Sequence, residues 1–204
     1  MMIQLRKEHE NLTSIELAKL TWYYPDNPLY KNPEHPTIKL AGEIGELLDL
    51  YGKHIYKPGF DWMDCKHCKQ HYALHTILDD DEYCQIGGNK YVPAVLDELG
   101  DIWYYLRILA WLYEVELRIA DKKYMDYSIL GSLQVMYSSA SILFRVFNWN
   151  DTTNKGKRVD NILNIYKHLN LLLEHLNYTI EDLTLVNYQK LVLDDTNHGW
   201  KDAR

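Results

Sequence analysis

Two pairs of acidic residues, each set inside an apolar run, constrain the fold of this chain more than any other feature. The first run covers residues 40–48 and holds Glu43 and Glu46, and the second covers residues 96–103 and holds Glu98 and Asp101. At about 100° per residue, the apolar residues of each run form one helical stripe, and the acids border that stripe. The two pairs occupy nearly the same angular offsets in the same rotational sense. The sequence therefore predicts two matched amphipathic helices.

The matched offsets also predict how these helices pair. If the stripes pack face to face, antiparallel helices bring all four carboxylates to one side, whereas parallel helices separate the two pairs. Four gathered carboxylates would repel one another and raise their pKa values. A divalent cation removes that conflict, and oxygen ligands without sulfur or imidazole favour Mg²⁺ or Mn²⁺. We therefore predict a metal site at Glu43, Glu46, Glu98 and Asp101. The alternative is two solvated helix faces with ordinary surface acids.

Charge and composition narrow the class of protein. The 204 residues carry a formal net charge of −7 without a prominent basic run, which disfavours a nucleic-acid or anionic membrane partner. We expect no membrane span, because no apolar run reaches the roughly 18 residues that a span needs, and Asp101, Arg107 and Glu114 interrupt the best candidate. The first residues lack the apolar region of a signal peptide, and three cysteines do not make a disulfide framework. We expect a single all-α domain over residues 1–204 of a cytoplasmic protein.

Hydrophobic periodicity predicts a helical bundle. We expect helices over about residues 11–24, 37–56, 93–113, 129–147 and 158–176, and a closing helix from about residue 179. Pro25, Pro28, Pro33 and Pro36 predict a loop between the first two helices. Thr179 and Asp182 have the spacing of a capping box at the start of the closing helix.

Residues 60–92 differ from the rest of the chain and indicate a loop-rich Cys/His insertion between the two carboxylate helices. This stretch is polar and rich in turn-forming residues, and it holds all three cysteines. Cys65 and Cys68 form a Cys-x-x-Cys pair, and with His71 and Cys84 they could close a tetrahedral zinc site. The alternative is a loop whose thiols and imidazoles bind no metal.

The second half of the chain repeats the first in outline. Residues 159–169 align with residues 96–106, and the apolar pattern is kept while the charges are lost. The replacements are Ser138 for Glu43, Ser141 for Glu46, Asn161 for Glu98 and Asn164 for Asp101. A degenerate internal duplication over residues 129–176 would give this pattern, so that the bundle consists of two antiparallel helical hairpins. The alternative is two unrelated hairpins that align by chance.

The acid pairs resemble the metal-binding motif of a known superfamily. Glu43-x-x-Glu46 followed by Glu98-x-x-Asp101 is similar to the motif of the all-α nucleoside triphosphate pyrophosphohydrolases, the MazG-like and dimeric dUTPase-like proteins. Further stretches resemble the short MazG-like proteins of phages and bacteria, namely residues 21–25, His35, 53–58, 100–104, 179–183 and 187–191. The insertion and the extra hairpin over residues 129–176 depart from that short pattern.

The resemblance implies Mg²⁺-dependent hydrolysis of a nucleoside triphosphate, expected to be a dNTP, between its α and β phosphates. The candidates for catalysis are Glu46, which lies farther from the apolar stripe, and Lys53, which follows on the same helix face. The candidates for binding phosphate are Lys53, Lys57 and Lys190, and those for binding the base are Trp22, Tyr105 and Asn187. For Lys53 the alternative is a surface lysine, and for Tyr105 it is a core aromatic residue.

Two other classes of function are weighed against this one. A di-iron carboxylate bundle normally uses Glu-x-x-His, and this spacing does not occur in the sequence. A non-catalytic nucleotide-binding or regulatory protein with the same fold would explain the lost acids of the second hairpin, although the intact acids of the first argue against it. The preferred base and the oligomeric state stay open, and a homodimer is common in the superfamily.

Overall fold

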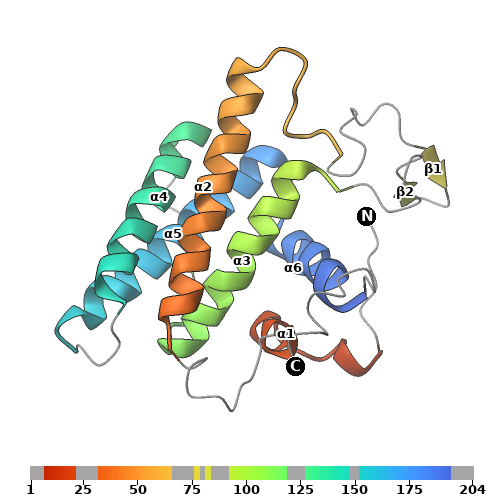
Figure 1. The fold of residues 1–204 in the computed structure, drawn as a ribbon. Coiled ribbons are helices and arrows are strands. Elements are labelled where there is room, and N and C mark those ends of the chain that lie inside the picture. The colour runs from red at the N-terminus through yellow and green to blue at the C-terminus, as the bar shows by residue number, and fades with distance from the viewer. Residues whose placement is uncertain are drawn as a thin grey trace.

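A computed structural model of the chain describes residues 7–21, 32–65, 76–78, 81–83, 92–118, 127–147 and 152–193. In these residues six α-helices pack as a bundle around one hydrophobic core (Figure 1). The helices are α1 (Ser14–Thr21), α2 (Glu34–Tyr56), α3 (Ala94–Leu112), α4 (Ile129–Val146), α5 (Lys155–Leu176) and α6 (Ile180–Tyr188). The expected all-α bundle is confirmed.

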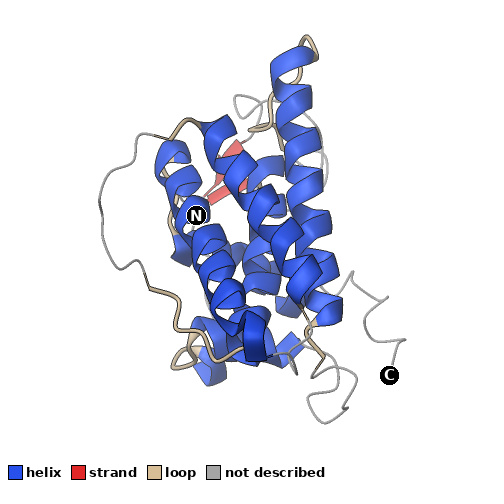
Figure 2. Cartoon of the chain, turned by 90° about the vertical axis from the view of Figure 1, so that its left-hand side faces the viewer, coloured by secondary structure: helices blue, strands red, loops and turns tan. Residues whose placement is uncertain are grey.

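The helix α3 lies at the centre of the bundle and packs against α1, α2, α5 and α6. Most of its residues are buried, and they face every direction around its axis. A helix that is apolar nearly all round is one that neighbours cover on every side. Figure 1 shows α2 beside α3, with α4 and α5 towards one side of this pair and α1 and α6 towards the other. Figure 2, turned by 90°, shows the helices closely packed along the bundle.

The helices α2 and α3 run antiparallel, as the colour sequence along them shows in Figure 1. The stripe of α2 predicted from the sequence is buried in this contact, with Leu40, Ile44 and Leu47 fully inaccessible to solvent. The helices α4 and α5 also run antiparallel to each other, and α4 covers a second side of α2.

Two helices begin earlier than predicted. The helix α2 begins at Glu34 rather than near residue 37, with Pro33 at its N-cap and Pro36 in its first turn. Proline is tolerated there because the first backbone N–H groups of a helix have no intrahelical partner, so prolines that predicted a loop instead open a helix. The helix α5 begins at Lys155 rather than near residue 158, since its first residues are exposed and give no hydrophobic period.

The closing helix begins as predicted. Thr179 Oγ1 accepts a hydrogen bond from the Asp182 backbone N–H at 3.2 Å, and the Asp182 carboxylate accepts one from the Thr179 N–H at 2.8 Å. These reciprocal bonds confirm the capping box. The chain then widens into a π-helical turn, Gln189–Leu193.

The insertion is anchored to the start of α3. The carbonyl groups of Trp62 and Asp64 accept hydrogen bonds at 3.0 Å from the N–H groups of Val95 and Ala94, which satisfies two donors at that helix end. Further along the insertion, β1 (Thr76–Leu78) and β2 (Asp81–Tyr83) form a short antiparallel ribbon. The sequence had indicated a loop-rich insertion and had not predicted this ribbon.

Three large apolar side chains are exposed on α4. Leu130, Tyr137 and Phe144 follow one another at intervals of seven residues and are 45%, 50% and 49% exposed. Among the described residues, α4 is long and apolar enough by length and composition to cross a membrane, which corrects the expectation that no run qualifies. One such helix is weak evidence of a membrane span, and α4 packs against α2 and α5 within the bundle.

Candidate metal centre

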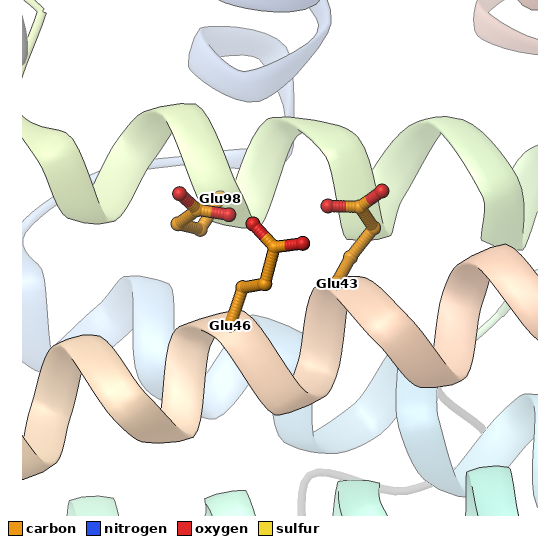
Figure 3. A group of neighbouring side chains, drawn as sticks. All are labelled: Glu43, Glu46 and Glu98. Atoms are coloured by element: carbon orange, nitrogen blue, oxygen red, sulfur yellow. The ribbon is translucent and has the colours of Figure 1, made fainter.

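Three of the four predicted carboxylates meet between α2 and α3. Glu43, Glu46 and Glu98 each offer a carboxylate oxygen, and these oxygens lie within 4.8 Å of one another. Figure 3 shows Glu43 and Glu46 rising from α2 towards α3, where Glu98 meets them. The antiparallel pairing of α2 and α3 produces this convergence, since the two pairs have the same angular offset from their stripes.

Burial and mutual repulsion disfavour the ionised forms of the carboxyl groups in this cluster. Burial raises the pKa of Glu43 to about 7, and repulsion from Asp101 and Glu46 adds to the effect. Burial likewise raises the pKa of Glu98 to about 7, with repulsion from Asp97 and Glu46 next in size. Near neutral pH these two carboxyl groups are therefore partly protonated without a cation. A positive charge that binds between them would favour their ionised forms.

The fourth predicted ligand, Asp101, is engaged by a lysine. Lys190 Nζ lies 2.5 Å from Asp101 Oδ2 and 3.3 Å from Asp97 Oδ1. Burial alone would lower the pKa of Lys190, but attraction to Asp101 and Asp97 outweighs it and raises that pKa. Lys190 is therefore a charged group beside the carboxylate cluster, where the sequence had proposed a phosphate ligand.

A buried arginine connects α3 to α1 and α6. Arg107 donates from Nη1 to the Ser14 carbonyl at 2.6 Å and from Nη2 to Asn187 Oδ1 at 2.9 Å, and its guanidinium lies over the Trp103 ring. Burial lowers the pKa of Arg107 to about 9. Asn187, proposed from the resemblance to bind the base, is buried, and its side-chain oxygen accepts the hydrogen bond from Arg107. Its Nδ2 has no hydrogen-bond partner among the described residues.

The other proposed substrate ligands are not all gathered at the cluster. Lys53 is exposed and pairs with Asp49 at 2.5 Å, and Lys57 lies over the Phe60 ring beyond the end of α2. Tyr105 is buried on α3, where burial, followed by the charge of Glu43, raises its pKa. Trp22 lies outside the described residues.

The proposed zinc ligands are described only at their first member. Cys65 is a buried free thiol, and its backbone forms an isolated β-bridge with Pro93 at the start of α3. Cys68, His71 and Cys84 lie outside the described residues. The zinc site stays a prediction.

The corresponding positions of the second hairpin carry no charge. Ser138 and Asn164 are exposed, and Ser141 is partly exposed. Asn161 is buried, and its Nδ2 donates a 2.6 Å hydrogen bond to the Lys157 carbonyl of its own helix. This bond lies within one helix, so Asn161 donates to its own backbone rather than to the other hairpin helix.

Sequence reasoning missed Asp97 and Arg107. Asp97 lies four residues before Asp101 on one face of α3, so its spacing could have marked it as a neighbour of the site. No local signal marks Arg107, because the two groups that accept hydrogen bonds from its terminal nitrogens belong to Ser14 and Asn187, on α1 and α6.

This arrangement has the donor set of a site for a hard cation. Three carboxylates from two helices each offer an oxygen within 4.8 Å of the others, and oxygen is the ligand that Mg²⁺ and Mn²⁺ prefer. Comparison with known proteins adds nothing to this argument, since no family model, no curated protein and no solved structure matches the chain.

Proposed function

We propose that the chain is an all-α nucleoside triphosphate pyrophosphohydrolase of the MazG-like and dimeric dUTPase-like superfamily. In this proposal it hydrolyses a nucleoside triphosphate, a dNTP above all, between the α and β phosphates, and releases the monophosphate and pyrophosphate. The supporting observation is the convergence of Glu43, Glu46 and Glu98 from antiparallel helices, with a lysine held at the next carboxylate, Asp101.

In this proposal the carboxylates bind the metal ion, and one of them also accepts a proton from the attacking water. Glu43, Glu98 and Asp101 hold Mg²⁺ or Mn²⁺, with Glu46 as a shared ligand. The bound ion would neutralise charge on the leaving pyrophosphate and lower the pKa of a coordinated water. Glu46 is the most exposed member of the group of three, so it can reach an attacking water and accept its proton.

The triphosphate needs positive groups besides the metal. Lys190 lies beside the carboxylates, and its ammonium group can donate hydrogen bonds to phosphate oxygens. Lys53 and Lys57 extend from the C-terminal end of α2 and remain proposals for the outer phosphates. Tyr105, Trp22 and Asn187 remain proposals for contacts with the base.

The proposal is tested by incubating the protein with a panel of canonical and modified nucleoside triphosphates and Mg²⁺. We expect equimolar monophosphate and pyrophosphate from at least one of them, and no turnover when a chelator removes the metal. Release of orthophosphate instead would contradict the cleavage position. Nucleotide binding without turnover across the panel would favour the regulatory alternative.

We further propose that α4 and α5 are a degenerate duplicate of α2 and α3. Both pairs are antiparallel, α2 packs on α4, and α3 packs on α5. The sequence alignment makes Trp103 equivalent to Tyr166, and these two rings stack on each other with centroids 5.8 Å apart. Equivalent residues contact each other when they lie near a local two-fold axis, so this stacking supports the duplication.

The cytoplasmic location and the homodimer expected from the sequence are also proposals. The exposed side chains of Leu130, Tyr137 and Phe144 on α4 would suit a second copy, because a two-fold axis brings the same surface of each copy together. Light scattering of the purified protein measures the oligomeric state directly.

A further inference from the structure

Lys190 occupies an unusual place in the chain. The helix α6 ends at Tyr188, and Lys190 lies in the π-helical turn that follows. Its side chain is 26% exposed and reaches back to α3, where it contacts Asp97 and Asp101. Single π-helical turns in proteins are frequently found at functional sites, because the wider turn redirects side chains. Lys190 is thus a mostly buried cation rather than a surface lysine.

The position of Lys190 is set by contacts on the preceding turns of α6. Thr184 Oγ1 accepts a hydrogen bond from Trp103 Nε1 at 2.9 Å, and Asn187 Oδ1 accepts one from Arg107 at 2.9 Å. Thr184, Asn187 and Lys190 follow at intervals of three residues, and all three contact α3. These contacts hold α6 against α3, and the turn that follows α6 places the Lys190 ammonium group beside Asp101.

Asp101 belongs to the same electrostatic unit as the three glutamates. It follows Glu98 by three residues on α3, and its charge contributes to the raised pKa values of both Glu43 and Glu98. The four carboxylates are nevertheless unequal. Three of them face one another, while the fourth is neutralised at 2.5 Å by an ammonium group of the protein itself. A divalent ion on Asp101 would have to displace that ammonium or lie beside it against charge repulsion.

We propose that Lys190 is an internal counter-ion that gates a second cation site at Asp101. Without nucleotide, Lys190 holds Asp101, and the three glutamates bind one divalent ion. When a triphosphate binds, its oxygens accept hydrogen bonds from the Lys190 ammonium group, which leaves Asp101, and Asp101 then ligates a second divalent ion. This inference rests on the proposed function, since it requires a polyphosphate ligand at the same site.

The gate predicts an ordered uptake of metal that a purely structural ion pair does not. If Lys190 only fastened α6 to α3, its removal would lower stability and leave the number of bound ions unchanged. If it competes with a cation for Asp101, its removal opens the second site without any nucleotide. The number of ions bound in the absence of nucleotide therefore distinguishes the two roles.

The test is Mn²⁺ binding by calorimetry and electron paramagnetic resonance, above the pKa of about 7 of Glu43 and Glu98. The nucleotide is a non-hydrolysable triphosphate with a methylene bridge between its α and β phosphorus atoms. For the wild-type chain we expect one Mn²⁺ without the analogue and two with it. For Lys190→Met we expect two Mn²⁺ without the analogue and weaker binding of the analogue.

Matched variants separate the gate from general effects of charge or folding. Lys190→Arg keeps the positive charge and should still bind one ion without the analogue. Lys155→Met removes an exposed lysine at the start of α5 and should behave as the wild type. If Lys190→Met does not fold, as judged by circular dichroism, Lys190→Gln replaces it with a polar side chain.

Two outcomes overturn the gate. One is a wild-type chain that binds two ions without the analogue, and the other is a folded Lys190→Met or Lys190→Gln variant that still binds only one. Failure of the proposed function looks different, because the panel of nucleoside triphosphates would then give no pyrophosphate, whatever the number of bound ions.

Discussion

The helix pairs α2/α3 and α4/α5 are both antiparallel hairpins, and they differ in the polar side chains along one edge. In α2 and α3 that edge carries half-buried carboxyl groups whose burial raises their pKa values. In α4 and α5 the aligned positions carry serine and asparagine, and Asn161 is satisfied by a backbone carbonyl of its own helix. The packing of a hairpin in this bundle therefore does not require acids at these positions. Carboxylates that oppose folding and are not needed for packing suggest a functional use.

The largest expected effect comes from removing one carboxylate of the first hairpin. Glu98→Ala should lower turnover at least about a hundredfold, which is the scale of one lost charge-stabilising group at a reaction centre. The fold should survive, and thermal stability should rise because burial and repulsion no longer oppose it. The measurement is pyrophosphate release together with a thermal melt.

The second hairpin supplies the control for that variant. Asn164→Ala changes an exposed residue at the position aligned with Asp101, so its turnover should match the wild type. Near-normal turnover of Glu98→Ala would remove the functional difference between the hairpins and with it the site assignment.

Restoring acids to the second hairpin tests the duplication. The variant combines Ser138→Glu, Ser141→Glu, Asn161→Glu and Asn164→Asp. We expect it to bind one more Mn²⁺ per chain than the wild type without nucleotide, because aligned backbone positions should recreate the oxygen cluster. We also expect lower stability without metal, since the acid at position 161 would be buried. A folded variant with no additional ion would argue that the hairpins align by chance.

The pH dependence of stability should come from the first hairpin. The pKa values of Glu43 and Glu98 are about 7 in the folded chain, against 4.5 as the ordinary value. Between these values the folded state holds more protons than the unfolded state, so these two groups lower the free energy of unfolding as pH rises. Denaturant melts of metal-free protein across that interval should show this decline.

Two additions sharpen the pH measurement. The double variant Glu43→Gln and Glu98→Gln should show a flatter profile, because neither amide titrates. Saturating Mg²⁺ should also flatten it for the wild-type chain, since the ion holds both groups in their ionised form. A wild-type profile that rises over the same interval in the absence of metal would contradict the assigned shifts.

The smallest expected effect concerns the zinc content of the segment that connects the helices of the first hairpin. A long insertion joins α2 to α3, whereas only a short segment separates α4 from α5. If Cys65, Cys68, His71 and Cys84 bind zinc, elemental analysis of protein purified without chelator should find about one equivalent per chain. Less than about a tenth of an equivalent in fully active protein would reject the zinc site under this one-site expectation.

The sequence by itself determined the helices and the faces of two of them. A period of 3.6 residues is a local property, so the stripes of α2 and α3 and the offset of their acids follow from spacing alone. The capping box at Thr179 is also local and was confirmed. The wrong start predicted for α2 also has a local cause. Pro36 predicts a loop, because its position in the first turn of a helix is not visible in the sequence.

Only the tertiary structure decided which carboxylates face one another and which is already paired. Lys190 reaches Asp101 across 89 positions of sequence, and Arg107 reaches Asn187 across 80. Such contacts depend on how α6 docks against α3, and apolar periodicity specifies a buried face without specifying its partner. The sequence therefore predicted one metal site of four acids, while the packing separates a cluster of three glutamates from an aspartate held by a lysine. The reason is that a partly buried charge is stabilised by an opposite charge close to it, and the docking of α6 places Lys190 beside Asp101.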